Sequence, residues 1–328
     1  MKKEKEVIMK KLEEKDRELL EFLMSLNQNT THVICRSQLE KFYSDIIETN
    51  NYIIAMGNIP VVLLAHMDTV RETNDEYMML YDSELNIATS VYGLGFDDKA
   101  GIAAIFKIIE DGYRPYVIFT HDEEKGGVGA YQLVKDYPEP PFKDKIKYMI
   151  QIDRRGKEDC VFYDDGNKEF HNYVESFGYY KTNYGSFSDI STIAPTWKVS
   201  AVNLSTGYYN EHTHDEFLII DEWYQTIDEI KKMLDNIDTA PYFIYEDTFG
   251  YPYIDFGLCD YCGKPLSYNN AVPIIGSDGE IKYYCDDCLD KHCDVCPECG
   301  EFYEIENPNI TVCKNCWNKI IGDMSWKN

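Results

Sequence analysis

Short apolar runs alternate with helical patterns between residues 61 and 237, and this alternation limits the fold more than any other feature of the chain. Four runs have the length and composition of buried strands: VVLLAH (61–66), YVIFT (116–120), YMIQID (148–153) and VSAVNL (199–204). Helices are predicted over 99–112, 127–137 and 221–237. This order predicts an α/β sheet with helices on its faces, in which ligands bind beyond the carboxyl ends of the strands.

Size and charge exclude several classes of protein. The chain has 328 residues, 44% of them hydrophobic, which excludes disordered, collagen-like and coiled-coil proteins. Its 32 Lys and Arg residues face 58 Asp and Glu residues, and the net charge of −26 repels phosphate backbones and anionic membranes. No apolar run approaches the ~20 residues that span a bilayer. We therefore expect neither nucleic acid nor a membrane as a partner.

The cysteines divide the chain. Only Cys35 and Cys160 precede residue 250, whereas nine lie between Cys259 and Cys316. Acidic residues interrupt the lysine-rich N-terminus, which therefore predicts an amphipathic helix rather than a signal peptide. Without an export signal, the cysteines are expected to bind metal in a reducing cytoplasm rather than to form disulfides. The predicted organisation is an N-terminal helix (1–30), a catalytic-type domain (31–250) and two zinc ribbons (256–290 and 291–328).

Two paired CxxC spacings predict two structural zinc sites, because each CxxC turn supplies two thiolates and two turns complete a tetrahedron. The first set is Cys259, Cys262, Cys285 and Cys288, and the second is Cys296, Cys299, Cys313 and Cys316. Cys293 has the same spacing to Cys296, but Pro297 and Gly300 favour the pair Cys296 and Cys299. His292 and Cys293 then stay unassigned. The ribbons are acidic, which favours a protein contact, self-association or packing beside the active site over nucleic acid.

Polar residues follow the predicted strands at the positions where an α/β sheet places its ligands. They are His66 with Asp68, Asp97, the pair Glu123 and Glu124, Asp153, and His212. Two histidines and three carboxylates suit a pair of zinc-like ions that share one carboxylate. One of the adjacent glutamates can bind metal while its neighbour stays free to move protons. Two such ions, about 3.5–4 Å apart, can polarise a carbonyl and activate water. Amide hydrolysis is the natural use of this set.

Five motifs resemble, in order, those of the co-catalytic zinc exopeptidases, which include peptidase T and the bacterial leucyl and glutamyl aminopeptidases. They are HMDTV, GLGFDDKAGIAA, FTHDEEKGGVGA, QIDRRG and GYYNEHTHDEF, within roughly residues 60–237. The resemblance implies a mixed sheet with helices on both faces. It also implies that His66, Asp97 and Asp153 hold one zinc and that His212, Asp97 and Glu124 hold the second. Asp97 would bridge the two ions, and Co²⁺ or Mn²⁺ is an alternative occupant of this pair.

The same resemblance assigns roles to further residues. Glu123 takes the place of the general base, and Asp68 that of the carboxylate that orients His66. The peptide between Asp97 and Asp98 is expected to be cis, and Gly101 is expected to let the following helix approach the metals. His214 is an alternative to His212 as the last ligand.

One departure from the resemblance concerns domain structure. Peptidase T carries a separate dimerisation domain between the fourth and fifth ligands, and the segment 154–211 is too short for it. The chain therefore resembles the single-domain aminopeptidases. Among nearby polar residues, His121 and Asp122 are expected to shape a turn, and His171 is expected to be a surface or packing residue rather than a ligand. Two pairs, Ser188 with Asp189 and Arg154 with Arg155, have either a structural or a substrate-binding role.

These observations predict a cytoplasmic di-zinc metallopeptidase with two catalytic and two structural zinc ions, acting as an aminopeptidase on short peptides. A deacylase or carboxypeptidase with the same metal centre is an alternative that the sequence does not separate. An inactive peptidase fold, whose zinc ribbons bind a partner protein, is a third reading. The complete set of metal-ligand types counts against this last reading.

Overall fold

The structure, a computed structural model, describes residues 10–70, 79–90, 95–177, 180–185 and 187–248 of the N-terminal part. In the C-terminal part it describes 258–264, 266, 272–275, 281–296, 302–305, 312 and 316. The chain divides into two compact units, Met1–Gly250 and Tyr251–Asn328. Among the helices in these ranges, none is long and apolar enough to cross a membrane.

An eight-stranded sheet forms the centre of the first unit, with the strand order β1-β2-β6-β3-β7-β10-β8-β9. Its strands are β1 (Ile46–Glu48), β2 (Tyr52–Ala55), β3 (Ile59–His66), β6 (Pro115–Thr120), β7 (Tyr148–Arg154), β8 (Asp159–Val161), β9 (Lys181–Asn183) and β10 (Ala201–Ser205). The four central strands β6, β3, β7 and β10 are parallel, whereas β2 and β8 join them antiparallel. The sheet is therefore mixed, and all four strands predicted from the sequence are confirmed.

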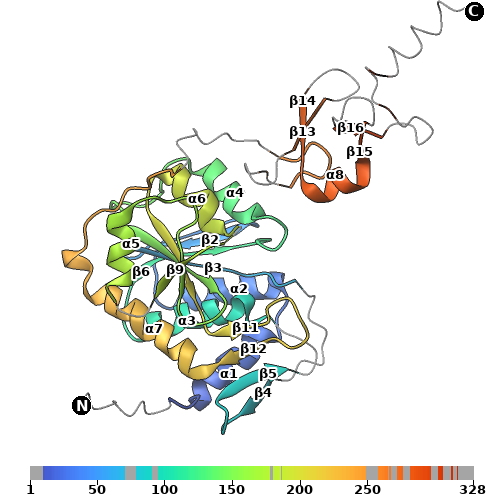
Figure 1. Cartoon of the computed structure of the whole chain (residues 1–328). Coiled ribbons are helices and arrows are strands. Elements are labelled where there is room, and N and C mark those ends of the chain that lie inside the picture. Colours follow the sequence, from blue (N-terminus) through green and yellow to red (C-terminus); the bar gives the residue numbers. More distant parts are fainter. Residues whose placement is uncertain are drawn as a thin grey trace, which may run out of the picture. The chain divides into compact units, whose positions relative to one another are not determined.

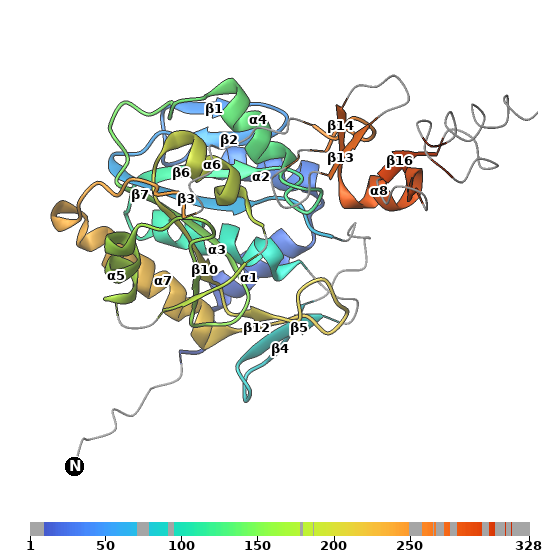
Figure 2. The same cartoon turned by 45° about the horizontal axis from the view of Figure 1, so that its top comes forward.

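Helices cover both faces of this sheet (Figures 1 and 2). One face packs against α1 (Glu14–Met24), α2 (Gln28–Leu39), α3 (Phe96–Glu110), α5 (Lys168–Glu175) and α7 (Ile220–Asp235), and the other against α4 (Val128–Asp136) and α6 (Asp189–Trp197). Successive residues of β3 show why: Val61 and Leu63 belong to the first buried cluster, and Val62 and Leu64 to the second. A strand buried on both faces reads as a continuous apolar run, as VVLLAH does.

A second, four-stranded sheet lies beside the chain segment that carries His212. It consists of β4 (Met79–Asp82), β5 (Ile87–Ser90), β11 (Tyr208–Tyr209) and β12 (Phe217–Ile219), in the order β11-β12-β5-β4. A short 3₁₀ helix, Ile237–Thr239, follows α7. The segment 154–211 supplies strands of the main sheet and helices on its faces, so the described residues there form no separate domain.

The N-terminal helix is integrated into the first unit. Residue 30, where we expected a domain boundary, lies inside α2. On α1, Asp16 is 2% exposed, and its Oδ2 atom lies 2.7 Å from Lys107 Nζ of α3 and accepts a hydrogen bond of 2.6 Å from Tyr224 OH of α7. This carboxylate therefore joins three helices.

We expect Asp16→Ala to lower the free energy of unfolding by about 3–5 kcal/mol, because it leaves a lysine and a hydroxyl without their shared partner. Urea denaturation monitored by circular dichroism measures this change. The control Glu18→Ala, at an exposed position of the same helix, is expected to stay within about 0.5 kcal/mol of the parent. Equal effects of the two substitutions would contradict the assigned role of Asp16.

The described residues of the second unit form two hairpins and one helix. Strand β13 (Val272–Ile275) pairs with β14 (Ile281–Tyr284), and β15 (Cys293–Val295) pairs with β16 (Phe302–Glu304), both antiparallel. Helix α8 (Asp286–His292) connects β14 to β15. Among the residues described there, cysteines account for four of the seven buried residues in its first core cluster.

Candidate metal centre and active site

The predicted site residues meet at the edge of the sheet where the parallel central strands end. His66 is the last residue of β3, Asp153 is the next-to-last residue of β7, and Glu123 and Glu124 follow β6. Asp97 lies at the start of α3, and His212 lies in the loop between β11 and β12. Because β3, β6 and β7 are parallel, their carboxyl ends lie side by side, and residues far apart in sequence come together there.

Two groups of metal-ligand types result, and Asp97 belongs to both. One ligand atom each from His66, Asp97 and Asp153 lies within 4.8 Å of the others, and the same holds for Asp97, Glu124 and His212. Asp97 Oδ1 is 3.0 Å from His66 Nε2, whereas Asp97 Oδ2 is 3.1 Å from His212 Nε2. The carboxylate thus directs one oxygen to each group, as a ligand shared by two ions must. Mixed imidazole and carboxylate donors suit zinc and similar divalent cations.

Asp68 connects the metal donors to the glutamate pair. Its Oδ1 atom lies 3.3 Å from His66 Nδ1, the ring nitrogen that does not face Asp97. The same carboxylate accepts hydrogen bonds from the backbone N–H groups of Glu123 (3.0 Å) and Glu124 (3.1 Å). Ligand atoms of His66, Glu123 and Glu124 also lie within 4.8 Å of one another. The second contact of Asp68, with the loop, is one that sequence reasoning missed.

Negative charge is in surplus at this site. Burial raises the pKa of Glu123 well above its usual range, and the nearby carboxylates of Asp153 and Asp189 raise it further. Burial and the neighbouring Asp97 raise the pKa of Asp153 to about 7. Burial would lower the pKa of His66, but hydrogen bonds with Asp153, Asp68 and Asp97 raise it well above its usual range. Divalent cations would offset this surplus and return these carboxylates to their ionised form.

Backbone contacts fix the start of α3 beside the donors. The Asp97–Asp98 peptide is cis, as the resemblance implies. Glu216, which is 2% exposed, accepts a 3.0 Å hydrogen bond from the Asp97 backbone N–H. A Cβ atom at Gly101 would lie 2.3 Å from both Asp98 Oδ1 and the carbonyl oxygen of Ile152, so only glycine allows this approach. Sequence reasoning placed Glu216 in the motif GYYNEHTHDEF but gave it no contact with Asp97.

The other polar candidates divide between packing and surface positions. His171 stacks on Phe162 with ring centroids 3.8 Å apart. Ser188 is fully buried and donates to Gln151, and the Asp189 carboxylate accepts from Thr120. Arg154 and Arg155 form ion pairs with Asp159 (3.5 Å) and Glu211 (2.8 Å). Among the described residues, His212 rather than His214 joins Asp97 and Glu124.

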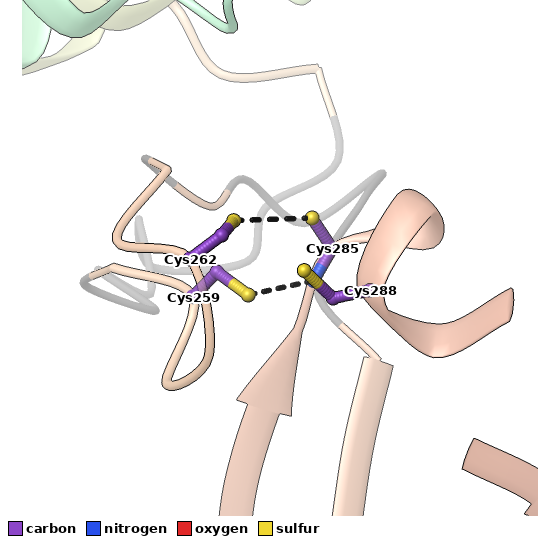
Figure 3. A group of neighbouring side chains, drawn as sticks. All are labelled: Cys259, Cys262, Cys285 and Cys288. Atoms are coloured by element: carbon purple, nitrogen blue, oxygen red, sulfur yellow. Dashed lines mark hydrogen bonds between the residues drawn. The ribbon is translucent and has the colours of Figure 1, made fainter. Parts of the chain in front are cut away.

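The first predicted cysteine site is assembled in the second unit (Figure 3). Cys259, Cys262, Cys285 and Cys288 each direct a sulfur to within 4.8 Å of the others. Cys262 Sγ lies 3.7 Å from Cys285 Sγ, and the Cys285 backbone N–H donates to Cys259 Sγ at 3.4 Å. Of the second predicted site, Cys296 and Cys316 are buried, whereas Cys299 and Cys313 lie outside the described residues, as do Pro297 and Gly300. The ring of His292 stacks on Tyr261, and Cys293 is buried in the first cluster.

Solved structures with the same fold include several peptidases. The chain is similar to aminopeptidase PepT from Bacillus cereus (TM-score 0.55, 14% identity, covering 68% of this chain and 97% of that one). It is also similar to a tripeptidase from Staphylococcus aureus (TM-score 0.56, 13% identity, covering 68% of this chain and 98% of that one). A third similar structure is a TET aminopeptidase from a Thaumarchaeota archaeon (TM-score 0.54, 13% identity, covering 69% of this chain and 99% of that one). At such identities the likeness shows a shared fold.

The family assignment comes from the sequence profile of Peptidase family M20/M25/M40, which matches residues 62–236. That segment contains every predicted ligand of the catalytic metal pair, together with Asp68 and Glu123. No curated protein matches the chain. The profile covers more than half of the chain, which therefore belongs to Peptidase family M20/M25/M40 and is a metallopeptidase.

Proposed function

We propose that this metallopeptidase is a di-zinc aminopeptidase acting on short peptides. The single observation that carries the proposal is the position of Asp97, which directs one carboxylate oxygen to each of two complete donor groups. His66 and Asp153 would complete the first zinc site, and Glu124 and His212 the second. The aminopeptidases and the tripeptidase that share the fold support an unblocked short peptide as the substrate.

The protein groups have defined tasks in this reaction. Two bound divalent cations would polarise the scissile carbonyl and make water a better nucleophile at neutral pH. Glu123 accepts a proton from the attacking water while the water oxygen forms a bond to the carbonyl carbon. When the C–N bond breaks, Glu123 returns that proton to the leaving amine nitrogen. Asp68 holds both His66 and the Glu123 backbone in place for these steps.

Removal and return of metal test the proposal. We expect dialysis against a chelator to lower peptidase activity by at least about 100-fold, because no side chain replaces the cations that polarise the carbonyl. Zn²⁺, Co²⁺ or Mn²⁺ should restore it. The assay compares one tripeptide with a free amino group, the same peptide N-acetylated, and the same peptide amidated at its C-terminus. Cleavage of only the acetylated peptide, or no recovery with any metal, would reject the aminopeptidase.

We further propose that the cysteines of the second unit hold two structural zinc ions, in ribbons over 256–290 and 291–328. Four sulfurs within 4.8 Å of one another support the first of these. Thiolate sites of this kind also support a reducing compartment, the cytoplasm. A protein partner or a second copy of the chain is the proposed contact of the ribbons.

Cys262→Ser is expected to lower the zinc content by about one ion per chain, since a tetrahedral site loses one of its four thiolates. Metal analysis of the purified full chain measures the change. Cys160→Ser removes a buried thiol of the first unit and should leave the zinc content unchanged. An unchanged content in Cys262→Ser would remove the first ribbon from the proposal.

A further inference from the structure

Helix α2 lies outside the segment that the family profile matches, yet one of its faces is connected to two chain segments of the candidate active site. The contacts come from Gln28 and, about one turn later, from Thr31 and His32. Residues three and four positions apart share a face, so the three side chains point in one direction. Farther along α2, Cys35 and Leu39 are fully buried in the apolar core.

Gln28 binds the residue that precedes the proposed general base. Its Nε2 atom donates to Asp122 Oδ1 at 3.2 Å, and its Oε1 atom accepts from the Asp122 backbone N–H at 3.3 Å. Asp122 has a φ of 52°, a left-handed conformation that is uncommon for residues other than glycine. The Gln28 amide thus binds both the carboxylate and the backbone N–H of a residue whose backbone directs the chain into Glu123.

His32 contacts His121, the residue that precedes Asp122. Its Nδ1 atom lies 2.8 Å from His121 Nε2, and its Nε2 atom lies 2.9 Å from Glu48 Oε1 of β1. The Gln28 amide donates to the other nitrogen of His121 at 2.9 Å. Burial and the neighbouring His32 ring lower the pKa of His121 to about 4, so this ring is neutral near pH 7. Both nitrogens of His121 are therefore occupied by α2.

Thr31 is connected through the Lys99 side chain to the segment that carries His66. The Lys99 side chain is 1% exposed, and its Nζ donates to Thr31 Oγ1 at 2.5 Å and to the carbonyl oxygen of Met67 at 2.6 Å. Met67 separates His66 from Asp68. The same helix face is thus connected to both chain segments whose relative position the Asp68 hydrogen bonds define.

We propose that Gln28 and His32 are positioning residues for catalysis, which hold the 121–124 loop so that the Glu123 carboxylate lies beside the metal donors. This inference rests on the proposed function, because it takes Glu123 as the general base. It assigns to α2 a part in the reaction, in addition to the packing of its apolar face.

A matched pair of substitutions tests the role of Gln28. Gln28 and Gln38 are both half-buried residues of α2, but the Gln38 amide contacts only Lys41 among the bonds described for it. We expect Gln28→Met to lower kcat by about 10–100-fold with KM changed less than about twofold, since a misplaced base slows the chemical step more than it weakens binding. Gln38→Met should keep the parent kcat. Equal kcat values for the two variants would overturn the proposal.

Two substitutions of His32 separate its two hydrogen bonds. An asparagine amide occupies about the position of Nδ1, which faces His121, whereas a glutamine amide occupies about that of Nε2, which faces Glu48. We expect His32→Asn to retain kcat within about threefold and His32→Gln to lose about tenfold. The reverse order would show that the contact with Glu48, and not that with His121, matters.

Hydrogen exchange separates a failure of this inference from a failure of the proposed function. The backbone N–H groups of Gly126, Gly127, Val128 and Gly129 donate to carbonyl oxygens of residues 121–123. Faster exchange over 121–129 in Gln28→Met than in Gln38→Met is expected whether or not a substrate is cleaved. If Glu123→Gln keeps full activity, the proposed function fails. If Glu123→Gln is inactive but Gln28→Met matches Gln38→Met in kcat and exchange, only the role of α2 fails.

Discussion

Glu123→Gln should lower kcat for a tripeptide by about 10²–10⁴-fold, the range over which a general acid–base group accelerates proton transfer. Glutamine keeps the size of the side chain, but its amide cannot accept the proton of the attacking water. Steady-state kinetics on the zinc-loaded full chain measure the effect. The control is Glu139→Gln, at an exposed position after α4, which should retain the parent kcat.

The metal content of Glu123→Gln distinguishes the loss of a general base from the loss of a metal ligand. Glu123 lies beside the donors but is not one of the proposed ligands, so Glu123→Gln should bind as many metal ions as the parent. A variant that is inactive because it has lost metal would point to Glu123 as a ligand. Equal turnover by Glu123→Gln and the parent would end the proposed mechanism.

Asp97→Asn is expected to remove metal from both catalytic positions. Substituting residues that only orient a metal ligand already lowers metal affinity by about 10–100-fold, and Asp97 directs an oxygen to each donor group. We therefore expect a loss of at least about 100-fold in affinity at both positions, with activity lost in parallel. Isothermal titration calorimetry, in which Zn²⁺ is added to the metal-depleted protein, measures the affinity and the number of ions bound.

The control for this substitution lies at the other end of the same helix, directly after its last residue. Asp111 follows the last residue of α3 and pairs with Lys231 at the surface, and Asp111→Asn should bind metal as the parent does. If Asp97→Asn lost only one of the two catalytic ions, Asp97 would not be a shared ligand.

The central fold was predictable because its strands carry a complete local signal. VVLLAH and YVIFT are buried on both faces, and their length and branched residues indicate strands. The outer strands β1, β8 and β9 have three residues each, too few for a periodic pattern. Their place in the sheet depends on partners such as β2 and β10, which local sequence does not reveal.

The candidate site was predictable where its functional residues are close neighbours in the sequence. His66 with Asp68, and Glu123 with Glu124, are short motifs at strand ends, and the structure brings them together. The supporting contacts were not predicted because they join residues that are far apart in the sequence. Glu216 binds the backbone of Asp97, and Gln28 binds that of Asp122. A single polar residue on a helix or in a loop carries no sign of its partner.

The pairing of β2 with β6 has a consequence for anyone who trims this gene to its recognisable core. A fragment limited to residues 62–236 would lack β2, whose residues Tyr52–Ala55 pair with Val117–Thr120 of β6. It would then present a bare apolar edge, VIFT, to other molecules, and such edges recruit further strands into aggregates. Covering this edge requires at least the upstream residues from Tyr52 onward, even though β2 carries none of the motifs by which the enzyme is recognised.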